Sequence, residues 1–197
     1  MNDLALLSVN IGNLVYNGNF EKVAIFEGKV APVGWYLHST SVYTPRCVED
    51  SADGLYSLET SMTLGSYVMN VRIQQGVYTA YAKFKQLEAG GIARLLMHVY
   101  DTRKSTEYQD VVFSGDYAIN NTDWTECMLT FNAPKYAYYL HFSPRSTDEK
   151  LVLVDSCKLA RGNKSIQDMR SIKAITPVLR QTQILTSVVG INYRIPT

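Results

Sequence analysis

Cysteine and histidine are both scarce, since the 197 residues include only three of each. Cys47, Cys127 and Cys157 form no CxxC pair and have no histidine at zinc-ligand spacing, which argues against a zinc-binding domain. Cys127 and Cys157 lie within alternating apolar stretches, where a thiol packs as a small hydrophobic side chain. We therefore predict free, buried cysteines and a fold that is stabilised by its core alone.

The sequence also lacks a long hydrophobic run and a strong net charge. No apolar stretch approaches the ~20 residues that a membrane-spanning helix needs. The formal net charge of +1 gives no general signal of nucleic-acid binding. Asp3 and Asn10 interrupt the apolar N-terminal stretch, so no secretory signal peptide is predicted. With 46% apolar residues, the chain is long enough to bury the core of one domain.

Tyrosine is abundant, with 14 residues against 6 phenylalanines. Short β-branched and aromatic stretches recur at intervals of about ten residues, with turn-forming residues between them. Tyr78, Ala80, Ala82 and Phe84 alternate with more polar residues, as in a strand that buries one face. About eight to ten such strands predict an all-β fold, an antiparallel β-sandwich or jelly roll.

The composition changes after Gly162. Residues 158–197 contain seven basic residues and one acid, Asp168, which gives +6 against −5 for the rest of the chain. Ser165 and Asp168 have the spacing of a capping box, and apolar residues follow at helical spacing as far as Pro177. The segment is too apolar for a solvated linker and is predicted to need a partner surface.

These features divide the chain into an N-terminal arm (1–12), a jelly roll (13–162) and a C-terminal arm with a helix and an extended segment (163–197). The C-terminal arm is predicted to bury seven apolar side chains against its own sandwich or another subunit: Ile166, Met169, Ile172, Ile184, Leu185, Val188 and Val189. Its basic residues are interleaved with apolar ones, so we predict contact with an acidic protein surface rather than nucleic acid. Docking in cis and docking in trans both remain open.

Six segments occur in an order that resembles a known family: NLVYNGNFE (13–21), Gly34-Trp35, DGLYSLET (53–60), GVYTAYAKFK (76–85), WTECMLTFNAP (124–134) and LVLVDSCKLARGN (151–163). The pattern is similar to the jelly roll of family 4/9 carbohydrate-binding modules, which bacterial glycosidases and bacteriophage tail and appendage proteins carry. KLARGNKS (158–165) resembles the end of the phage versions, with Ala160 in place of an acid. Trp35 and Trp124 begin strands in this pattern and are predicted to be core anchors.

The sequence offers no constellation typical of catalysis. The three histidines belong to no nucleophile elbow and no HExxH motif. Acids gather loosely at Glu49, Asp50 and Asp53 and again at Asp148 and Glu149, as expected of solvated turns. The protein is therefore predicted not to be an enzyme.

A sugar platform is the first candidate site. Five residues fall on the outward register of three predicted strands: Tyr81, His98, Tyr100, Tyr139 and His141. Aromatic rings with polar tips on one open sheet are suited to glycan binding. Tyrosine is also enriched at protein interfaces, so a protein contact, or one of the arms lying across this face, explains the same pattern.

Calcium is the second candidate, and the resemblance implies it. In the resembled fold a calcium ion often joins the N-terminal segment to the last strand, and Glu21 and Asp155 match the positions that supply carboxylates. The turn at Asp53 and Gly54 could add carbonyl oxygen, a ligand that Ca²⁺ accepts. Alternatively, Glu21 and Asp155 accept hydrogen bonds from turn amides.

Together these observations predict a non-enzymatic bacteriophage virion protein from a tail appendage, fibre, baseplate or capsid-surface decoration. Its expected partners are other virion proteins and further copies of itself, and its location is the virion, assembled in the host cytoplasm. No membrane or nucleic-acid partner and no required cofactor are predicted, apart from the structural calcium. The alternative is a carbohydrate-binding module that attaches a particle or an enzyme to cell-surface polysaccharide.

Overall fold

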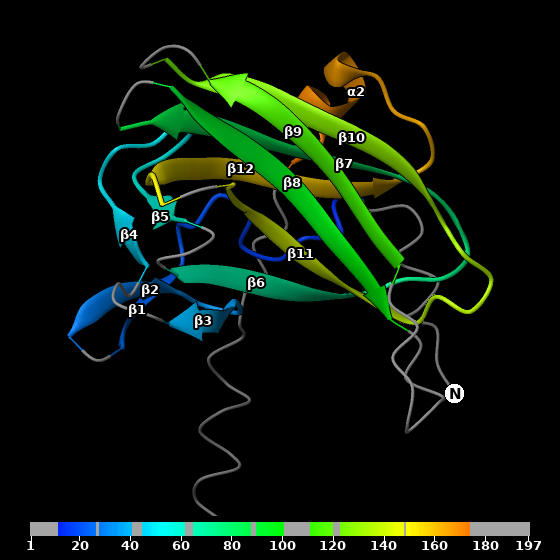
Figure 1. Cartoon of the computed structure of the whole chain (residues 1–197), viewed down its shortest axis with the longest axis horizontal. Helices are drawn as coiled ribbons and strands as arrows, with labels where there is room; N and C mark the ends of the chain where they lie inside the picture. Colours follow the sequence, from blue (N-terminus) through cyan, green and yellow to red (C-terminus); the bar gives the residue numbers. More distant parts are fainter. Residues whose placement is uncertain are drawn as a thin grey trace, which may run out of the picture.

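Two five-stranded sheets face each other across a hydrophobic core in the computed structural model (Figure 1). The structure describes residues 12–26, 28–40, 45–61, 65–87, 90–100, 111–119, 123–147 and 149–173. The first sheet has the order β10 (Thr125–Ala133), β7 (Gly76–Gln86), β12 (Val152–Arg161), β5 (Ser57–Thr60) and β4 (Arg46–Val48). The second has the order β3 (Tyr36–Thr40), β6 (Gly65–Arg72), β11 (Tyr139–Ser146), β8 (Gly91–Tyr100) and β9 (Val111–Ile119).

A separate two-stranded ribbon pairs β1 (Val23–Phe26) with β2 (Lys29–Pro32). Every strand pairing in the described ranges is antiparallel. The predicted all-β sandwich is thus confirmed. Among these residues no helix is long and apolar enough to cross a bilayer.

The core is built by alternate residues of each strand. In β8, Leu95, Met97 and Val99 are fully buried between the sheets, while His98 and Tyr100 point outward and are half-buried. The residues of β7 that were predicted to face inward are all buried in the same core: Tyr78, Ala80, Ala82 and Phe84. Alternation along these strands therefore decides which side chains reach the outer faces.

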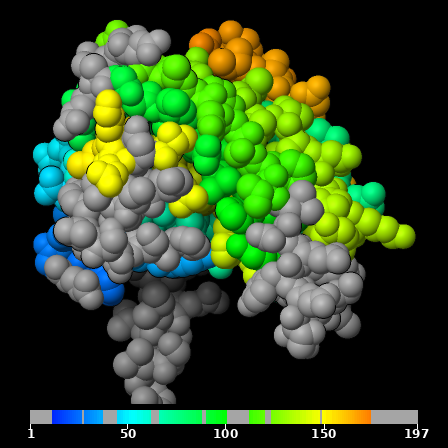
Figure 2. Space-filling model, viewed as in Figure 1, coloured from blue at the N-terminus to red at the C-terminus, as the bar shows by residue number. Residues whose placement is uncertain are grey.

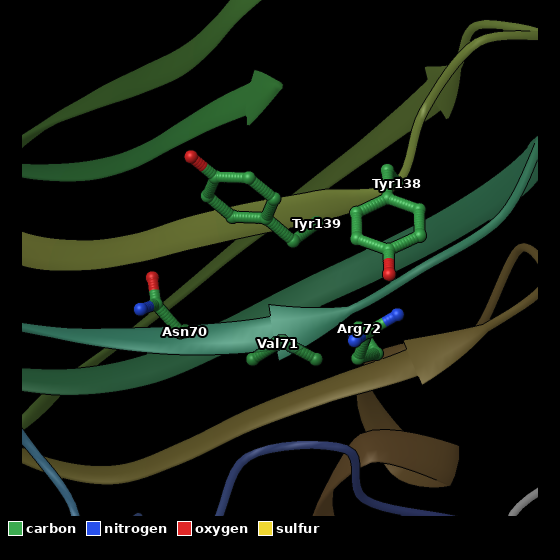
Figure 3. Close-up of a pocket in the computed structure, with 5 residues that line it drawn as sticks. All are labelled: Asn70, Val71, Arg72, Tyr138 and Tyr139. Atoms are coloured by element: carbon green, nitrogen blue, oxygen red, sulfur yellow. The ribbon is translucent and has the colours of Figure 1, made fainter. Parts of the chain in front are cut away.

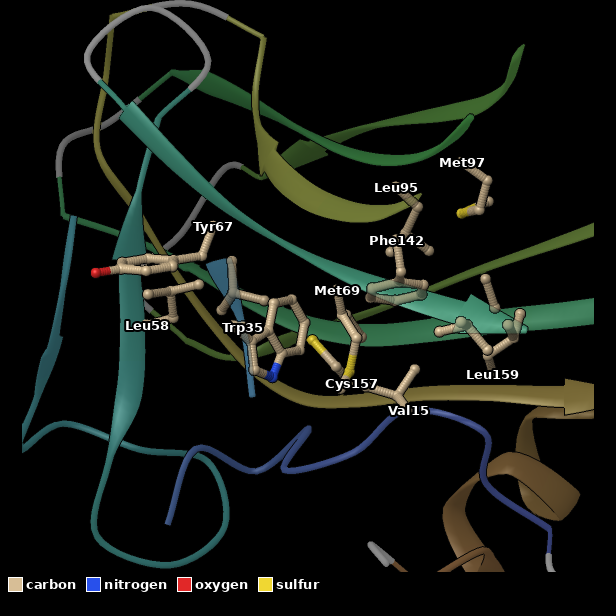
Figure 4. Packing of buried hydrophobic residues seen from close by; sticks show 14 of the residues in the cluster. Val15, Trp35, Leu58, Tyr67, Met69, Leu95, Met97, Phe142, Cys157 and Leu159 are labelled. Atoms are coloured by element: carbon tan, nitrogen blue, oxygen red, sulfur yellow. The ribbon is translucent and has the colours of Figure 1, made fainter. Parts of the chain in front are cut away.

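Trp35 lies at the centre of this core, as predicted (Figure 4). Its ring centroid is 5.0 Å from that of Phe20 and 6.2 Å from that of Phe142, which it meets edge-on at 79°. The indole Nε1 donates to the carbonyl oxygen of Tyr16 at 3.1 Å. Trp124, by contrast, is only half-buried, so its predicted role as a core anchor was wrong.

Residues 13–20 form no extended strand and contain a turn at residues 17–19, where the N–H of Phe20 donates to the carbonyl of Asn17 at 3.1 Å. Two buried amides hold this segment in place. The Oδ1 atom of Asn13 accepts from the backbone N–H of Leu159 at 3.0 Å. The side chain of Asn17 bonds both the N–H and the carbonyl of Lys22, at 2.9 and 2.8 Å. Asn13 and Asn17 are therefore structural, because they satisfy backbone groups that a regular ladder would otherwise pair.

The helix α2 (Ile166–Ser171) begins at Ser165, where the predicted capping box is confirmed. The Ser165 hydroxyl accepts from the N–H of Asp168 at 3.1 Å, and the Asp168 carboxylate accepts from the N–H of Ser165 at 2.9 Å. All three cysteines are free and buried, which confirms a further prediction. The remaining apolar residues of the C-terminal arm lie outside the described residues: Ile184, Leu185, Val188 and Val189.

Candidate functional site

Four aromatic side chains gather on the outer face of the second sheet, on β8 and β11. Strand register places Tyr139 opposite Tyr100 and His141 opposite His98. The rings of Tyr100 and Tyr139 stack at 5.0 Å and 13°. His98 stacks on Tyr100 at 6.2 Å and 17°, and the His141 ring lies 4.6 Å from that of Tyr100. The sequence predicted this grouping, and all four side chains are half-buried.

Tyr36 extends the aromatic cluster from β3. Its hydroxyl donates to Oδ1 of Asn70 at 3.0 Å and lies 2.8 Å from Nε2 of His141. A hydroxyl has a single hydrogen, so Nε2 of His141 must be the donor to the Tyr36 oxygen. Burial, the largest cause, raises the pKa of Tyr36 to about 12, and this hydroxyl therefore stays protonated at neutral pH.

A pocket of about 230 Å³ lies beside these rings (Figure 3), and its lining residues are Asn70, Val71, Arg72, Tyr138 and Tyr139. The guanidinium carbon of Arg72 sits 4.2 Å from the centroid of the Tyr138 ring, a cation–π contact. The rings of Tyr138 and Tyr139 meet edge-on at 84°. The pocket therefore combines aromatic walls with two polar side chains, Asn70 and Arg72.

The accessible part of this face is the end that carries the rings. Further along the same strands Val68, Leu96 and Ser143 also point outward, yet they are 1%, 4% and 3% exposed. Asn70 and Arg72, by contrast, are exposed. In the space-filling view, β8 and β9 (green) lie toward the viewer and α2 (orange) lies at the upper edge (Figure 2).

Tyr81 does not belong to the aromatic cluster, and its assignment to the sugar platform was wrong. It lies on β7, in the first sheet, and is 1% exposed. Met169 of α2 and Ala160 of β12 pack against it. The alternation of β7 correctly placed Tyr81 on an outer face. That face belongs to the other sheet, and the C-terminal helix covers it.

Charged contacts hold α2 against the first sheet. The Glu126 carboxylate accepts hydrogen bonds from Tyr81 and from the Arg170 guanidinium, whose Nε lies 2.9 Å from Oε1. These hydrogen bonds lower the pKa of Glu126 to about 2, and the bond from Arg170 has the largest effect. The Lys158 ammonium donates to the carbonyl of Met169 at 2.8 Å, near the end of the helix. The start of the C-terminal arm thus docks on its own sandwich, in cis.

Glu21 and Asp155 both hold the loop at residues 51–56, on which the calcium prediction depended. Oδ2 of Asp155 accepts from the N–H groups of Ala52 and Asp53, at 2.8 and 2.9 Å. Oε1 of Glu21 accepts from the N–H groups of Leu55 and Tyr56, at 2.8 and 3.0 Å. These bonds correspond to the alternative interpretation, in which the two carboxylates serve turn amides.

The described carboxylates alone do not make up a metal site. Within the described ranges no three His, Cys, Asp or Glu side chains converge as metal ligands would. Three N–H donors surround the Asp155 carboxylate, and burial raises its pKa to about 7. Gly54, with φ +101°, leaves space for Glu21, since a Cβ there would lie 2.4 Å from Oε1. Through these contacts Glu21 and Asp155 anchor the loop at residues 51–56, and the structural calcium stays a prediction.

Comparison with known proteins places this geometry in a known fold. No family model and no curated protein matches the sequence. A putative sugar binding protein from Bacteroides thetaiotaomicron is similar over 76% of this chain and 100% of its own, with a TM-score of 0.57 and 11% identity. A family 16 carbohydrate-binding module matches over 76% of this chain and 100% of its own, with a TM-score of 0.53 and 15% identity.

The enzymatically active domain of tailspike protein 4 of bacteriophage CBA120 is also similar, with a TM-score of 0.54 and 14% identity over 76% of this chain. The match spans 21% of that tailspike chain. At such low identity these likenesses establish the fold alone. The protein therefore has the jelly-roll fold of carbohydrate-binding modules, as the six ordered segments of the sequence predicted.

Proposed function

We propose that this protein binds carbohydrate, without catalysis, on the outer face of the second sheet. The observation that carries the proposal is the stacked pair of Tyr100 and Tyr139, with His98 and His141 beside it. The exposed parts of these half-buried rings offer apolar carbon atoms to the C–H groups of a sugar and keep polar atoms at their edges. The fold shared with carbohydrate-binding modules supports the same function.

The roles of the surrounding residues follow from their contacts. Tyr139 lies at the junction of the aromatic cluster and the pocket, so it is the expected central contact for a sugar ring. Tyr36, Asn70 and His141 form one hydrogen-bonded group that lines the approach with polar atoms. These bonds also hold the three side chains in place before a ligand arrives, which reduces the entropy lost on binding.

Replacement of Tyr139 tests the proposal. Tyr139→Ala is expected to weaken retention on immobilised or gel-embedded polysaccharide by about 10-fold or more, because a central aromatic contact is removed. Affinity electrophoresis over a panel of soluble polysaccharides measures the change. Tyr81→Phe is the matched control, since Tyr81 lies under α2 and its variant should be retained like the wild type. Equal retention of the Tyr139→Ala variant and the wild type would contradict the proposal.

A role as a bacteriophage virion component is the second candidate, and the likeness to a tailspike domain favours it. In this role the jelly roll supplies a stable unit and the arms join neighbouring proteins or further copies of the chain. Sugar binding by the aromatic cluster and assembly through the arms are compatible, because they depend on different residues. The cis docking of α2 leaves residues 174–197 as the part of the C-terminal arm that would contact a neighbour.

Removal of residues 174–197 tests this assembly role. A chain that ends at Lys173 keeps α2, which covers Tyr81 and buries Met169, so its first sheet stays covered. We expect light scattering to give an oligomeric mass for the full chain and a monomeric mass for the shortened one, because the omitted segment carries four of the predicted assembly residues. Monomeric masses for both chains would refute self-assembly through this arm.

A further inference from the structure

The outer face of the second sheet carries an excess of positive charge. Its described strand residues include three arginines, Arg72, Arg94 and Arg145, against one acid, Asp116. Arg94 is neutralised locally, because its guanidinium makes two hydrogen bonds to the Asp116 carboxylate, at 2.6 and 2.7 Å. Arg72 and Arg145 remain uncompensated within the described residues. A ligand with negative charge would therefore be attracted to this face.

Arg145 and Arg72 differ in access. Arg145 is directly opposite Arg94 in the register, and its Nε is buried without a hydrogen-bond partner in the described part of the chain. Its charge adds to the field at this face, but it is poorly placed to contact a polymer. Arg72 is exposed at the other end, next to the aromatic cluster. The accessible cation of this face is therefore Arg72.

The contacts of Arg72 leave its hydrogen-bond donors available. The guanidinium carbon lies 4.2 Å from the Tyr138 ring centroid, a cation–π contact. Such a contact is not a hydrogen bond to a polar acceptor, so N–H groups of Arg72 stay available to bind a planar anion through two parallel hydrogen bonds. Among the described carboxylates, none forms an ion pair with Arg72.

Asn70 makes the pocket richer in donors. Its Oδ1 accepts from the Tyr36 hydroxyl, and this bond leaves the two amide hydrogens of Nδ2 available in the pocket. Together Arg72 and Asn70 present N–H groups but few acceptors. A neutral sugar offers hydroxyl groups that both donate and accept, whereas a carboxylate only accepts. The pocket thus matches a carboxylate better than a neutral ring.

We propose that the site recognises an acidic polysaccharide, with a uronic acid ring on Tyr139 and its carboxylate on Arg72. Tyr139 and Arg72 are register partners on β11 and β6, so their Cα atoms lie about 5 Å apart, within reach of one sugar residue. This inference rests on the proposed carbohydrate binding and names its ligand class. It assigns Arg72 the role of distinguishing a charged sugar from its neutral counterpart.

Matched pairs of polysaccharides test the inference. The probes are polygalacturonate, alginate and glucuronoxylan, each compared with its carboxyl-reduced form, which keeps the backbone and loses the charge. The wild type is expected to bind at least one acidic form about 10-fold more tightly than the reduced form, a preference that weakens with added salt. Arg72→Gln should abolish that preference, because it should weaken binding to the acidic form more than binding to the reduced form, and Tyr139→Ala should weaken binding to both.

The outcomes separate this inference from the proposed function. Equal binding of the acidic and reduced forms by the wild type, or binding to neutral polysaccharides alone, would overturn the acidic-ligand inference and leave carbohydrate binding intact. A preference that persists in Arg72→Gln would remove Arg72 from the recognition of charge. Failure to bind every acidic and neutral polysaccharide tested would reject the proposed function and this inference with it. Thermal unfolding of Arg72→Gln should match the wild type, since Arg72 is exposed.

Discussion

Trp35→Ala is expected to lower the free energy of unfolding by about 3–5 kcal/mol, the usual cost of removing a large buried aromatic side chain. Trp35 is 6% exposed and packs on Phe20 and Phe142 between the two sheets. Its removal also leaves the carbonyl oxygens of Tyr16 and Asn17 without the indole N–H. Packing and hydrogen bonding are therefore lost together.

Trp35→Phe separates the two contributions, because a phenyl ring keeps part of the packing but has no N–H. Its destabilisation should be clearly smaller than that of Trp35→Ala, as measured by the midpoint and slope of urea denaturation. Val112→Ala serves as a control at an exposed position, 49% exposed, and should change the free energy of unfolding by less than about 0.5 kcal/mol. A loss below about 1 kcal/mol in Trp35→Ala would contradict the central place of Trp35 in the core.

Asp155→Ala is expected to destabilise the fold by about 2–4 kcal/mol at pH 5, because it leaves three backbone N–H groups without their acceptor. These groups belong to Ala52, Asp53 and Ser156, and the Asp155 side chain is fully buried. The loop at residues 51–56 loses one of its two carboxylate anchors as a result. Asp116→Ala is the matched control, since it breaks a largely exposed ion pair and should cost at most about 1 kcal/mol.

The effect of Asp155→Ala should also depend on pH. Burial raises the pKa of Asp155 to about 7 in the native state, whereas an aspartate in an unfolded chain has a pKa near 3.9. Between these values the native state holds a proton that the unfolded state has released. The contribution of this group to stability is therefore complete below about pH 4 and is lost as the pH rises through about 7.

Denaturation of the wild type and Asp155→Ala at pH 5 and pH 8 measures this linkage. The difference in unfolding free energy between the two proteins should shrink from pH 5 to pH 8, because only the wild type has the group that must ionise. Groups common to both proteins, including Glu126, whose pKa is lowered to about 2, cancel in this comparison. A difference that stays constant between pH 5 and pH 8 would contradict this, because it would show that Asp155 is already ionised in the native state at pH 5.

Much of the fold could be predicted from the sequence, because alternation and turn residues report strands locally. The alternation of β8 placed Leu95 and Met97 in the core and His98 and Tyr100 outside it, as the structure shows. The capping box at Ser165 could also be predicted, because it depends on residues only three positions apart in the sequence. The contacts that hold residues 13–20 could not be predicted, because their partners lie on β12, far along the chain.

Local sequence patterns predicted only part of the candidate site. Alternation predicts that a side chain lies on an outer face, but it does not show to which of the two sheets that face belongs. For this reason Tyr81 of the first sheet was wrongly assigned to the aromatic cluster of the second sheet. The pocket escaped prediction because Asn70 and Arg72 on β6 meet Tyr139 on β11 only through strand pairing. A signal for Tyr36 did exist, since it follows Trp35, and a buried Trp35 turns the next side chain outward.

The most direct test of sugar binding on this face is a map of the surface that a ligand touches. An oligosaccharide from a polysaccharide that the protein retains would be titrated into isotope-labelled protein, and the backbone amide shifts followed by NMR. We predict that the largest shifts fall at residues 70–72, 98–100 and 138–141, on β6, β8 and β11. Shifts that cluster instead around α2 and β10, on the outer face of the first sheet, would contradict the account.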